Sequence, residues 1–481
     1  LTVKFDMDTM TDDSIVLAFD KKKTDARKSW LLESTAKDAD QLEVAYGDVK
    51  QLDITDFVHK DLVNFSLADL KRSIAHVADG LKPSQRKVMY SCFQRNLTME
   101  MKVAQLAAYV AEKSAYHHGE VSLAETIVKL ANDYTGSNNV NLLEPCGQFG
   151  TRLMGGKDAS QTRYIFTRLT SAARKIFDPK DDPILNYLDD DGRSIEPEFY
   201  VPALPMVLVN GTEGIGTGFS CYVPPFNPKD ISTNILNFIN GKGIQKMKPW
   251  FRGFKGRVFY ENETWVTEGI WNMIGQTIRV TELPPGRWTQ DYKEHLDTLT
   301  EKKTISSYTN NSTTENVDFV IQGYTGKDLI KDLKLQKTVR TSNMHLFHPT
   351  KGIHKYESAE MILMDFIKLR NEYYNKRKSH MVNILKKKVE LYNHRAKFVT
   401  MVINGTLVVF RRKKRDLEEE LSHTFPKVDG SYDYLLNTKT VDYTEERVAA
   451  LLMEVKHSRD ELNLTMSTSP LQMWENDIKN I

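Results

Sequence analysis

Cysteine is scarce in this chain of 481 residues, where it occurs only as Cys92, Cys146 and Cys221. The three are scattered and form no Cys-x-x-Cys pair, which argues against a disulfide framework and against structural zinc. No apolar run approaches the roughly 20 residues that a membrane helix needs. No signal peptide is visible at Leu1 either. These absences favour a globular protein inside the cell, without a membrane segment.

The overall charge is nearly balanced, with a formal net charge of +2, 27% charged and 40% hydrophobic residues. This composition is typical of a globular chain, and the length suggests roughly three domains. The cations are nevertheless clustered, because residues 70–118 hold eight Lys or Arg against three acidic residues, a local net charge of +5. Cations that neutralise phosphates release counterions, so this segment is a candidate nucleic-acid contact; the alternative is a solvated helix face.

A helix is predicted to begin at Pro83, within the segment Lys82 to Lys87. Proline at the first helical position sacrifices no hydrogen bond, and Val88, Met89 and Phe93 then supply an apolar stripe. The free N–H groups of the helix start and the neighbouring cations together suit a phosphate.

Two further helix starts are predicted from capping-box spacing. Ser66 precedes Asp69, and Ser122 precedes Glu125, by the three positions that let a serine and an acidic side chain bond the first turn. With the helix at Pro83, they predict a helix-rich region of winged-helix type over residues 53–202.

From about residue 205 to residue 349 the pattern changes from helical to alternating. Residues 256–260, 277–281 and 317–321 alternate apolar and polar side chains between Gly, Pro and Asn turns. This period of two predicts strands, and hence a β-rich domain with inserted helices.

Two long helices are predicted beyond residue 349. Residues 353–404 contain neither Pro nor Gly, so a helix from about Ser358 to Ile403 would extend on the order of 70 Å at 1.5 Å per residue. A second helix is expected from Thr444 to Leu464. Joined by a compact tip, the two would form an antiparallel coiled-coil arm.

Tyr164 is a candidate nucleophile for a phosphate. It follows Arg163 and lies downstream of a run rich in Gly, Gln and Arg from Gly147 to Asp158. A phenol is a poor nucleophile unless a neighbouring base or cation activates it and stabilises the charge that develops on the phosphate, and Arg163 and Lys157 are placed to help. The alternative is a buried tyrosine whose hydroxyl has a hydrogen-bond partner.

Four sequence blocks, taken together, carry a resemblance to a known family. They are Gly147 to Arg168, Lys82 to Lys87, Tyr116-His117-His118-Gly119-Glu120, and Asn210 to Gly218. In order and spacing they resemble the type IIA DNA topoisomerases of the eukaryotic kind, over nearly the whole chain. The resemblance implies the DNA-binding and breakage-reunion region of a DNA topoisomerase II, an isomerase that cuts duplex DNA transiently, passes a second duplex and religates the first.

The resemblance implies three catalytic residues. Tyr164 matches the tyrosine that attacks a DNA phosphodiester and holds one broken end as a 5′-phosphotyrosine. Arg163 matches the adjacent arginine that stabilises the transition state, and His118 matches a histidine near the scissile phosphate. A lone histidine outside such a block would more often have a structural role.

The resemblance also implies residues that contact DNA. Ile215 matches a residue that enters a base step and bends the duplex. The glycines around it would let the backbone approach DNA; they lack the strand–loop–Gly-Lys-Ser/Thr order of a nucleotide-binding loop. The alternative for Ile215 is a buried position in a tight turn. The cations expected on the DNA are Arg72, Lys82, Arg86, Lys87 and Lys157.

The implied fold class is α+β and multidomain. Residues 1–50 would be the tail of a metal-binding (TOPRIM) domain with its connecting helix. Residues 51–203 would form the winged-helix DNA-cleavage domain and residues 204–349 a β-rich tower domain. Residues 350–481 would form the coiled-coil arm, with a dimer interface called the C-gate.

Cofactors are expected outside this chain. The family cleaves DNA with Mg²⁺ ions held by a Glu and an Asp-x-Asp pair of a separate domain, and neither those motifs nor an ATPase domain occur here. We therefore assign no metal ligand and expect Mg²⁺ and ATP to act in the full-length enzyme. The expected partners are double-stranded DNA and a second copy of the chain in a homodimer, without a membrane. The expected location is the nucleus, or the host cytoplasm or virion if the source is a large DNA virus; a protist source is also open.

Two alternatives to this interpretation remain. One is a bacterial protein like the A-type subunits of gyrase or topoisomerase IV, which is less favoured because the blocks Lys82 to Lys87 and Tyr116 to Glu120 have the eukaryotic form. The other is a non-catalytic scaffold that bends DNA, which the intact Arg163-Tyr164 pair and His118 disfavour.

Overall fold

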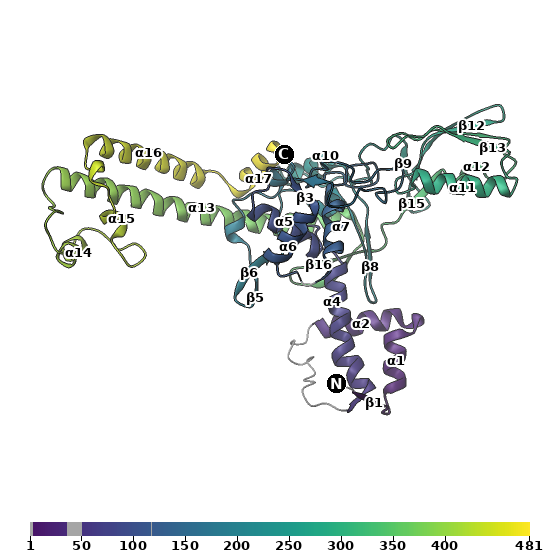
Figure 1. The fold of residues 1–481 in the computed structure, drawn as a ribbon, viewed down its shortest axis with the longest axis horizontal. Helices are drawn as coiled ribbons and strands as arrows, with labels where there is room; N and C mark the ends of the chain where they lie inside the picture. The colour runs from purple at the N-terminus through teal and green to yellow at the C-terminus, as the bar shows by residue number, and fades with distance from the viewer. Residues whose placement is uncertain (1–2, 36–50, 117) are drawn as a thin grey trace. The chain divides into compact units, whose positions relative to one another are not determined.

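The computed structural model describes residues 3–35, 51–116 and 118–481 (Figure 1). It mixes helices with small sheets, which confirms the α+β class. The chain divides into two compact units, the first formed by Leu1–Arg370 with Asp477–Ile481 and the second by Asn371–Asn476. His117 and the end of the expected connecting helix, residues 36–50, lie outside the described residues.

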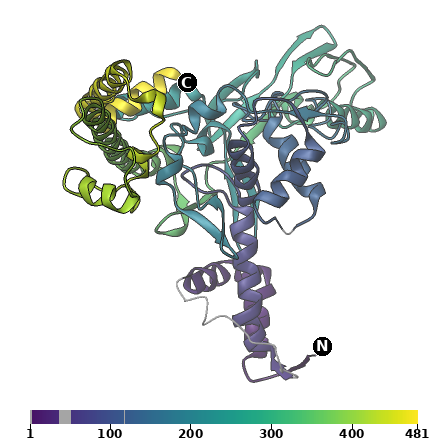
Figure 2. The same ribbon diagram turned by 60° about the vertical axis from the view of Figure 1, so that its left-hand side comes forward.

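A continuous helical run links the N-terminal elements to the centre of the first unit. It comprises α3 (Ile54–Asp56), a π-helical segment (Phe57–Leu62) and α4 (Val63–Ser73), which follow one another without a break (Figure 2). The helix start expected at Ser66 is therefore wrong, because the Ser66 hydroxyl donates to the carbonyl of Leu62 within the helix instead of capping it. The elements before this run are β1 (Lys4–Asp6), α1 (Thr11–Phe19), α2 (Thr24–Thr35) and β2 (Gln51–Asp53), and β1 pairs in parallel with β2.

Three helices, α5 (Pro83–Gln94), α6 (Val103–Lys113) and α7 (Glu120–Ala131), pack together after this run. The start predicted at Pro83 is confirmed, with Lys82 at the N-cap and the predicted apolar stripe buried. The start expected at Ser122 is wrong, since α7 already begins at Glu120. The Ser122 carbonyl accepts from the Thr126 hydroxyl within the helix.

Short antiparallel strand pairs connect the helices of the first unit. The β3–β4 pair and the β7–β8 hairpin carry the candidate site. The pairs are β3 (Met101–Lys102) with β4 (Phe166–Thr167), β5 (Tyr187–Asp190) with β6 (Arg193–Pro197), β7 (Thr212–Ile215) with β8 (Ser220–Val223), and β16 (Met344–His348) with β17 (Gly352–Tyr356); the helices among them are α8 (Ala173–Ile176), α9 (Met206–Val209) and α10 (Pro228–Ile239).

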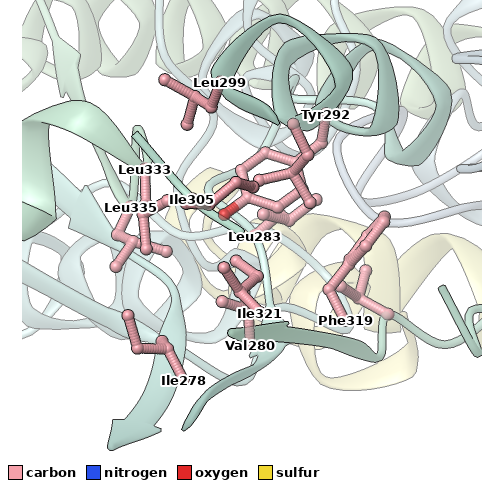
Figure 3. Close-up of a cluster of buried hydrophobic side chains, with 12 residues drawn as sticks. Ile278, Val280, Leu283, Tyr292, Leu299, Ile305, Phe319, Ile321, Leu333 and Leu335 are labelled. Atoms are coloured by element: carbon pink, nitrogen blue, oxygen red, sulfur yellow. The ribbon is translucent and has the colours of Figure 1, made fainter. Parts of the chain in front are cut away.

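Two larger antiparallel sheets form the β-rich part, with strand orders β15-β10-β9 and β11-β12-β14-β13. The three strands predicted from alternation are confirmed as β9, β12 and β14. Residues of helix α11 such as Tyr292 point into the second sheet's core, toward Phe319 and Ile321 (Figure 3). The bounds are β9 (Arg257–Glu261), β10 (Thr264–Glu268), β11 (Ile270–Ile274), β12 (Thr277–Glu282), α11 (Thr289–Glu301), β13 (Ser307–Asn310), β14 (Phe319–Gln322), α12 (Leu329–Asp332) and β15 (Gln336–Val339).

The predicted long helices are confirmed as α13 (Ala359–Ile403) and α16 (Glu445–Ser467). In the second unit they run antiparallel, because Lys378 of α13 donates to the Met466 carbonyl at the end of α16, while Phe398 shares a buried cluster with Leu451 near its start. The base of α13 belongs to the first unit, where Arg370 forms an ion pair with Asp181. The remaining helices are α14 (Lys414–Ser422), α15 (Asp433–Leu436) and α17 (Pro470–Asn480).

A half-buried histidine, His76, lies between α4 and α5. Its ring stacks on Phe199 with centroids 4.5 Å apart, and its Nδ1 accepts from the N–H of Ala78. Burial lowers the pKa of His76 to about 4, although the nearby Asp79 opposes this shift. The ring is therefore neutral in the folded protein down to mildly acidic pH.

We predict that the free energy of unfolding decreases as the pH falls from about 6.5 to about 4. In this window the unfolded chain binds a proton at His76 that the folded chain does not, so protonation favours unfolding. Asn at this position keeps an acceptor for Ala78 but cannot titrate. Urea unfolding across this range should therefore give a shallower pH slope for His76→Asn than for the wild type; equal slopes would contradict the assignment.

Candidate active site

Tyr164 lies in a tight turn and presents its phenol to solvent. Its N–H donates to the carbonyl of Gln161 over 2.9 Å, which closes the turn. The Tyr164 side chain is 66% exposed, whereas the following residue, Ile165, is 1% exposed and anchors the chain in the core. The alternative of a buried, hydrogen-bonded tyrosine is therefore wrong.

The turn is pinned by the start of α6. The N–H of Val103 donates to the carbonyl of Ile165 over 3.0 Å, and that of Ala104 donates to the carbonyl of Thr162 over 3.2 Å. The first N–H groups of a helix have no partner inside it. The carbonyls of the turn accept from two such groups at the start of α6. Pairing of Phe166 with both Lys102 and Cys146 then holds the chain after Tyr164.

Arg163 places positive charge next to the phenol of Tyr164. The guanidinium carbon of Arg163 lies 4.9 Å from the centroid of the Tyr164 ring, and both side chains are exposed. Lys157 is exposed and lines, together with Arg163 and residues of α7, a cavity of about 720 Å³. The arrangement can stabilise negative charge that develops next to the phenol.

The glycine-rich run before Tyr164 is tightly packed. A Cβ on Gly155 would lie 2.3 Å from the Trp288 ring, and a Cβ on Gly150 would lie 2.5 Å from the Cα of Gly156. Asp158 accepts from both the N–H and the hydroxyl of Thr151. Glycine is therefore required here for close approach, and the run is a rigid support for the turn.

His118 lies just before Gly119, the N-cap of α7, and is exposed. Its ring meets the ring of Tyr116 edge to face, with centroids 5.4 Å apart. Among the described residues no contact joins His118 to Tyr164, so its part in the site stays a prediction.

Arg86 differs from its expected place on the DNA backbone, and that expectation is corrected. Its guanidinium is buried and donates to Asp79 through Nε over 2.7 Å and to the carbonyl of Leu81. Burial alone would lower the pKa of Arg86, but Asp79 outweighs it and raises the pKa. Asp79 also accepts from the N–H groups of Leu81 and Tyr200. Arg86 therefore fixes the loop before α5 from inside.

The other three cations of this region differ in their partners and in their exposure to solvent. Lys87 forms an ion pair with Glu196 over 2.8 Å and is largely covered. Lys82 donates to the main-chain carbonyl of Glu213 over 2.7 Å. Arg72 is 57% exposed and shares Asp69 with the β7–β8 hairpin. Arg72 and Lys82 thus lie where a phosphate can reach them, and Lys87 is the least accessible of the three.

Ile215 ends strand β7 and is 79% exposed, so the alternative of a buried isoleucine is wrong. The flanking glycines pack closely against α4. A Cβ on Gly214 would lie 2.1 Å from the carbonyl oxygen of Ser73, and one on Gly216 would lie 2.9 Å from the Leu70 side chain. These glycines let the hairpin pack on α4, which leaves Ile215 projecting.

No group of three or more His, Cys, Asp or Glu side chains within residues 3–35, 51–116 and 118–481 could hold a metal ion. The residues described thus offer no set that would hold Mg²⁺, whose ligands the family resemblance places outside this chain. None of the described helices is long and apolar enough to cross a membrane.

Comparison with known proteins gives the class to which this fold belongs. The structure matches a crystal structure of the Plasmodium falciparum topoisomerase II DNA-binding, cleavage and re-ligation domain, with a TM-score of 0.87 and 41% identity over 99% of this chain and 70% of that one. Residues 72–479 match the family model for the A-type subunits of DNA gyrase and topoisomerase IV, and residues 2–70 match that for the C-terminal associated domain of TOPRIM. The chain belongs to this DNA gyrase/topoisomerase IV family.

Similar curated proteins include eukaryotic DNA topoisomerases 2. The chain is 41% identical to DNA topoisomerase 2 of Plasmodium falciparum over 98% of its length, and 38% identical to DNA topoisomerase 2 of Saccharomyces cerevisiae over 97%. These findings confirm the resemblance to the eukaryotic kind. The chain spans 37% of the length of each of these two relatives.

Sequence reasoning missed the carboxylates that position the cations. Asp69, Asp79 and Glu196 bind Arg72, Arg86 and Lys87 respectively. The Asp69–Arg72 pair has the i, i+3 spacing of a helical ion pair and could have been found. The other two pairs join residues that only the tertiary fold brings together.

We predict that Arg86→Ala lowers the free energy of unfolding by about 3–5 kcal/mol, because Asp79 would remain buried without its counter-charge. Arg72→Ala, which removes a surface cation, should cost only about 0–1 kcal/mol. Urea unfolding of both variants measures the difference. Similar losses in the two would show that the burial of Arg86 does not govern its contribution.

Proposed function

We propose that this chain is the breakage-reunion region of a DNA topoisomerase II, which cuts both strands of one duplex, lets a second duplex pass and reseals the first. The observation that carries the proposal is the exposed phenol of Tyr164 beside Arg163, on a turn pinned by α6. A tyrosine that served packing alone would have no reason to project from so rigid a support.

In the proposed reaction the Oη of Tyr164 attacks a backbone phosphorus. The phenolic proton leaves to solvent or to a nearby base, the bond from phosphorus to the 3′-oxygen breaks, and a 3′-hydroxyl and a 5′-phosphotyrosine result. One ester replaces another, so religation is the reverse attack by the 3′-hydroxyl and needs no further energy. Arg163 and Lys157 would stabilise the charge on the phosphoryl oxygens, and His118 is proposed to contact the same phosphate.

DNA is proposed to lie along the cations that remain accessible. Arg72 and Lys82 would bind backbone phosphates, with Lys87 as a more covered contact, and Ile215 would enter a base step. Arg86 is left out of this set because its guanidinium is buried against Asp79.

The domain assignment from the family resemblance is kept as a proposal. Residues 1–50 would complete a metal-binding domain, 51–203 the winged-helix domain, 204–349 the tower and 350–481 the coiled-coil arm. Mg²⁺ and ATP would be bound by parts of the full-length enzyme outside this chain. The match of residues 2–70 to a TOPRIM-associated domain supports the first assignment.

A homodimer is proposed because one Tyr164 cuts one strand and a double-strand break needs two. The second unit supports this with exposed apolar side chains, among them Val408, Phe410 and Val441, on the part proposed as the C-gate. We place the protein in the nucleus with its DNA, or in the host cytoplasm or virion if the source is viral.

We predict that the chain, supplied with the missing metal-binding domain and magnesium, forms a covalent adduct with supercoiled DNA that survives SDS. Tyr164→Phe should abolish the adduct, because phenylalanine keeps the ring but has no attacking oxygen. Tyr187→Phe, which alters an exposed tyrosine away from the turn, serves as the matched control. If Tyr164→Phe forms as much adduct as wild type, a non-catalytic DNA-bending scaffold becomes the better explanation.

A further inference from the structure

The β7–β8 hairpin that carries Ile215 is held by one carboxylate of α4. Oδ2 of Asp69 accepts from the N–H of Thr217 over 2.9 Å and from the Thr217 hydroxyl over 3.1 Å. Thr217 lies two residues beyond Ile215, in the loop that closes the hairpin. Asp69 and Thr217 are separated by 148 residues in sequence, so these bonds fix the loop to a distant segment of the chain.

A second set of contacts limits how the hairpin can move. The Lys82 ammonium donates to the Glu213 carbonyl over 2.7 Å, and Gly214 packs so closely on Ser73 that a Cβ would meet its carbonyl oxygen. These contacts hold the strand, whereas Asp69 holds the loop on the far side of Ile215. The isoleucine is thus clamped on both sides while its own side chain stays free.

Asp69 also binds a second residue, Arg72. Its Oδ1 accepts from Arg72 over 2.8 Å, one of the cations proposed to bind the DNA backbone. Burial would raise the pKa of Asp69, but the hydrogen bonds from Arg72 and Thr217 outweigh it, so the pKa lies below the ordinary value. One ionised carboxylate therefore orients both a phosphate contact and the loop next to the wedge.

We propose that Asp69 is a positioning residue for DNA bending, which fixes the hairpin so that Ile215 enters the base step. This inference rests on the proposed function. It assigns to Asp69 a role in DNA bending and none in the affinity for DNA. Entry of a side chain between base pairs costs unstacking energy, so the wedge must be held firmly enough not to be displaced by the stacked bases. Without Asp69 the loop would yield, and Ile215 would lie against the duplex instead of entering it.

The proposal predicts that removal of Asp69 reduces DNA bending without weakening DNA binding. Removal of Asp69 deletes one negative charge and releases Arg72, so binding to DNA should not weaken. Bending should decrease, because the wedge loses the acceptor for two hydrogen bonds. A merely structural role would lower both together, along with the thermal stability of the chain.

The test uses the 481-residue chain and a duplex of about 30 base pairs, long enough to bend measurably. The duplex carries donor and acceptor dyes at its ends, and energy transfer reports the bend while a titration gives Kd. For Asp69→Ala we expect about a tenfold lower ratio of bent to straight DNA, since the hydrogen bonds to a charged acceptor are worth on the order of one decade in equilibrium. The Kd should remain within about twofold of wild type or become tighter.

Two further variants serve as comparisons for the loss of bending in Asp69→Ala. Thr217→Val removes the hydroxyl donor but keeps the N–H, so it should give a smaller loss of bending. Asp56→Asn alters an acidic residue of the same helical run, which pairs with Lys60, and should behave as wild type. Unchanged bending in Asp69→Ala overturns the proposal, as does an equal loss of bending, affinity and thermal stability.

Ile215→Ala separates this inference from the function on which it rests. If Ile215→Ala bends DNA as well as wild type does, the wedge itself is wrong and the proposed DNA contact fails with it. If Ile215→Ala loses bending but Asp69→Ala does not, the wedge stands and the assignment of Asp69 is overturned.

Discussion

The site depends on two main-chain hydrogen bonds, from Val103 and Ala104 at the start of α6 to the carbonyls of Ile165 and Thr162. They satisfy helix donors that would otherwise lack partners, and they fix the turn from which Tyr164 projects. Because Ile165 is buried next to it, the backbone cannot swing the phenol away without opening the core. A nucleophile must be placed within a fraction of an ångström to be effective, so a rigid turn is a condition of the proposed chemistry.

Buried or partly buried carboxylates determine which cations of the site are exposed. Asp79 draws Arg86 into the interior and Glu196 covers Lys87, whereas Asp69 leaves Arg72 at the surface. A segment that looks uniformly basic in sequence therefore contains both internal supports and accessible contacts. The cost of burying a charge without its partner keeps the two kinds apart.

Periodic elements could be predicted from the sequence, and contacts between distant segments could not. The long helix α13 and strand β12 follow from local patterns, and the start of α5 follows from Pro83. The capping boxes at Ser66 and Ser122 were misleading, because the Ser66 hydroxyl bonds the backbone of its own helix instead of capping it. Ser122 lies inside α7, which already begins at Glu120.

For the site, the family resemblance pointed to Tyr164 and Ile215, and the exposure of both agrees with the roles proposed. The most direct test of the account is to find which residue carries the DNA after cleavage. Trypsin should cut after Arg163 and Arg168, and mass spectrometry of the digested adduct should find the nucleotide on the peptide from Tyr164 to Arg168. A nucleotide on a peptide that contains Tyr116 or Tyr134 instead would contradict the account.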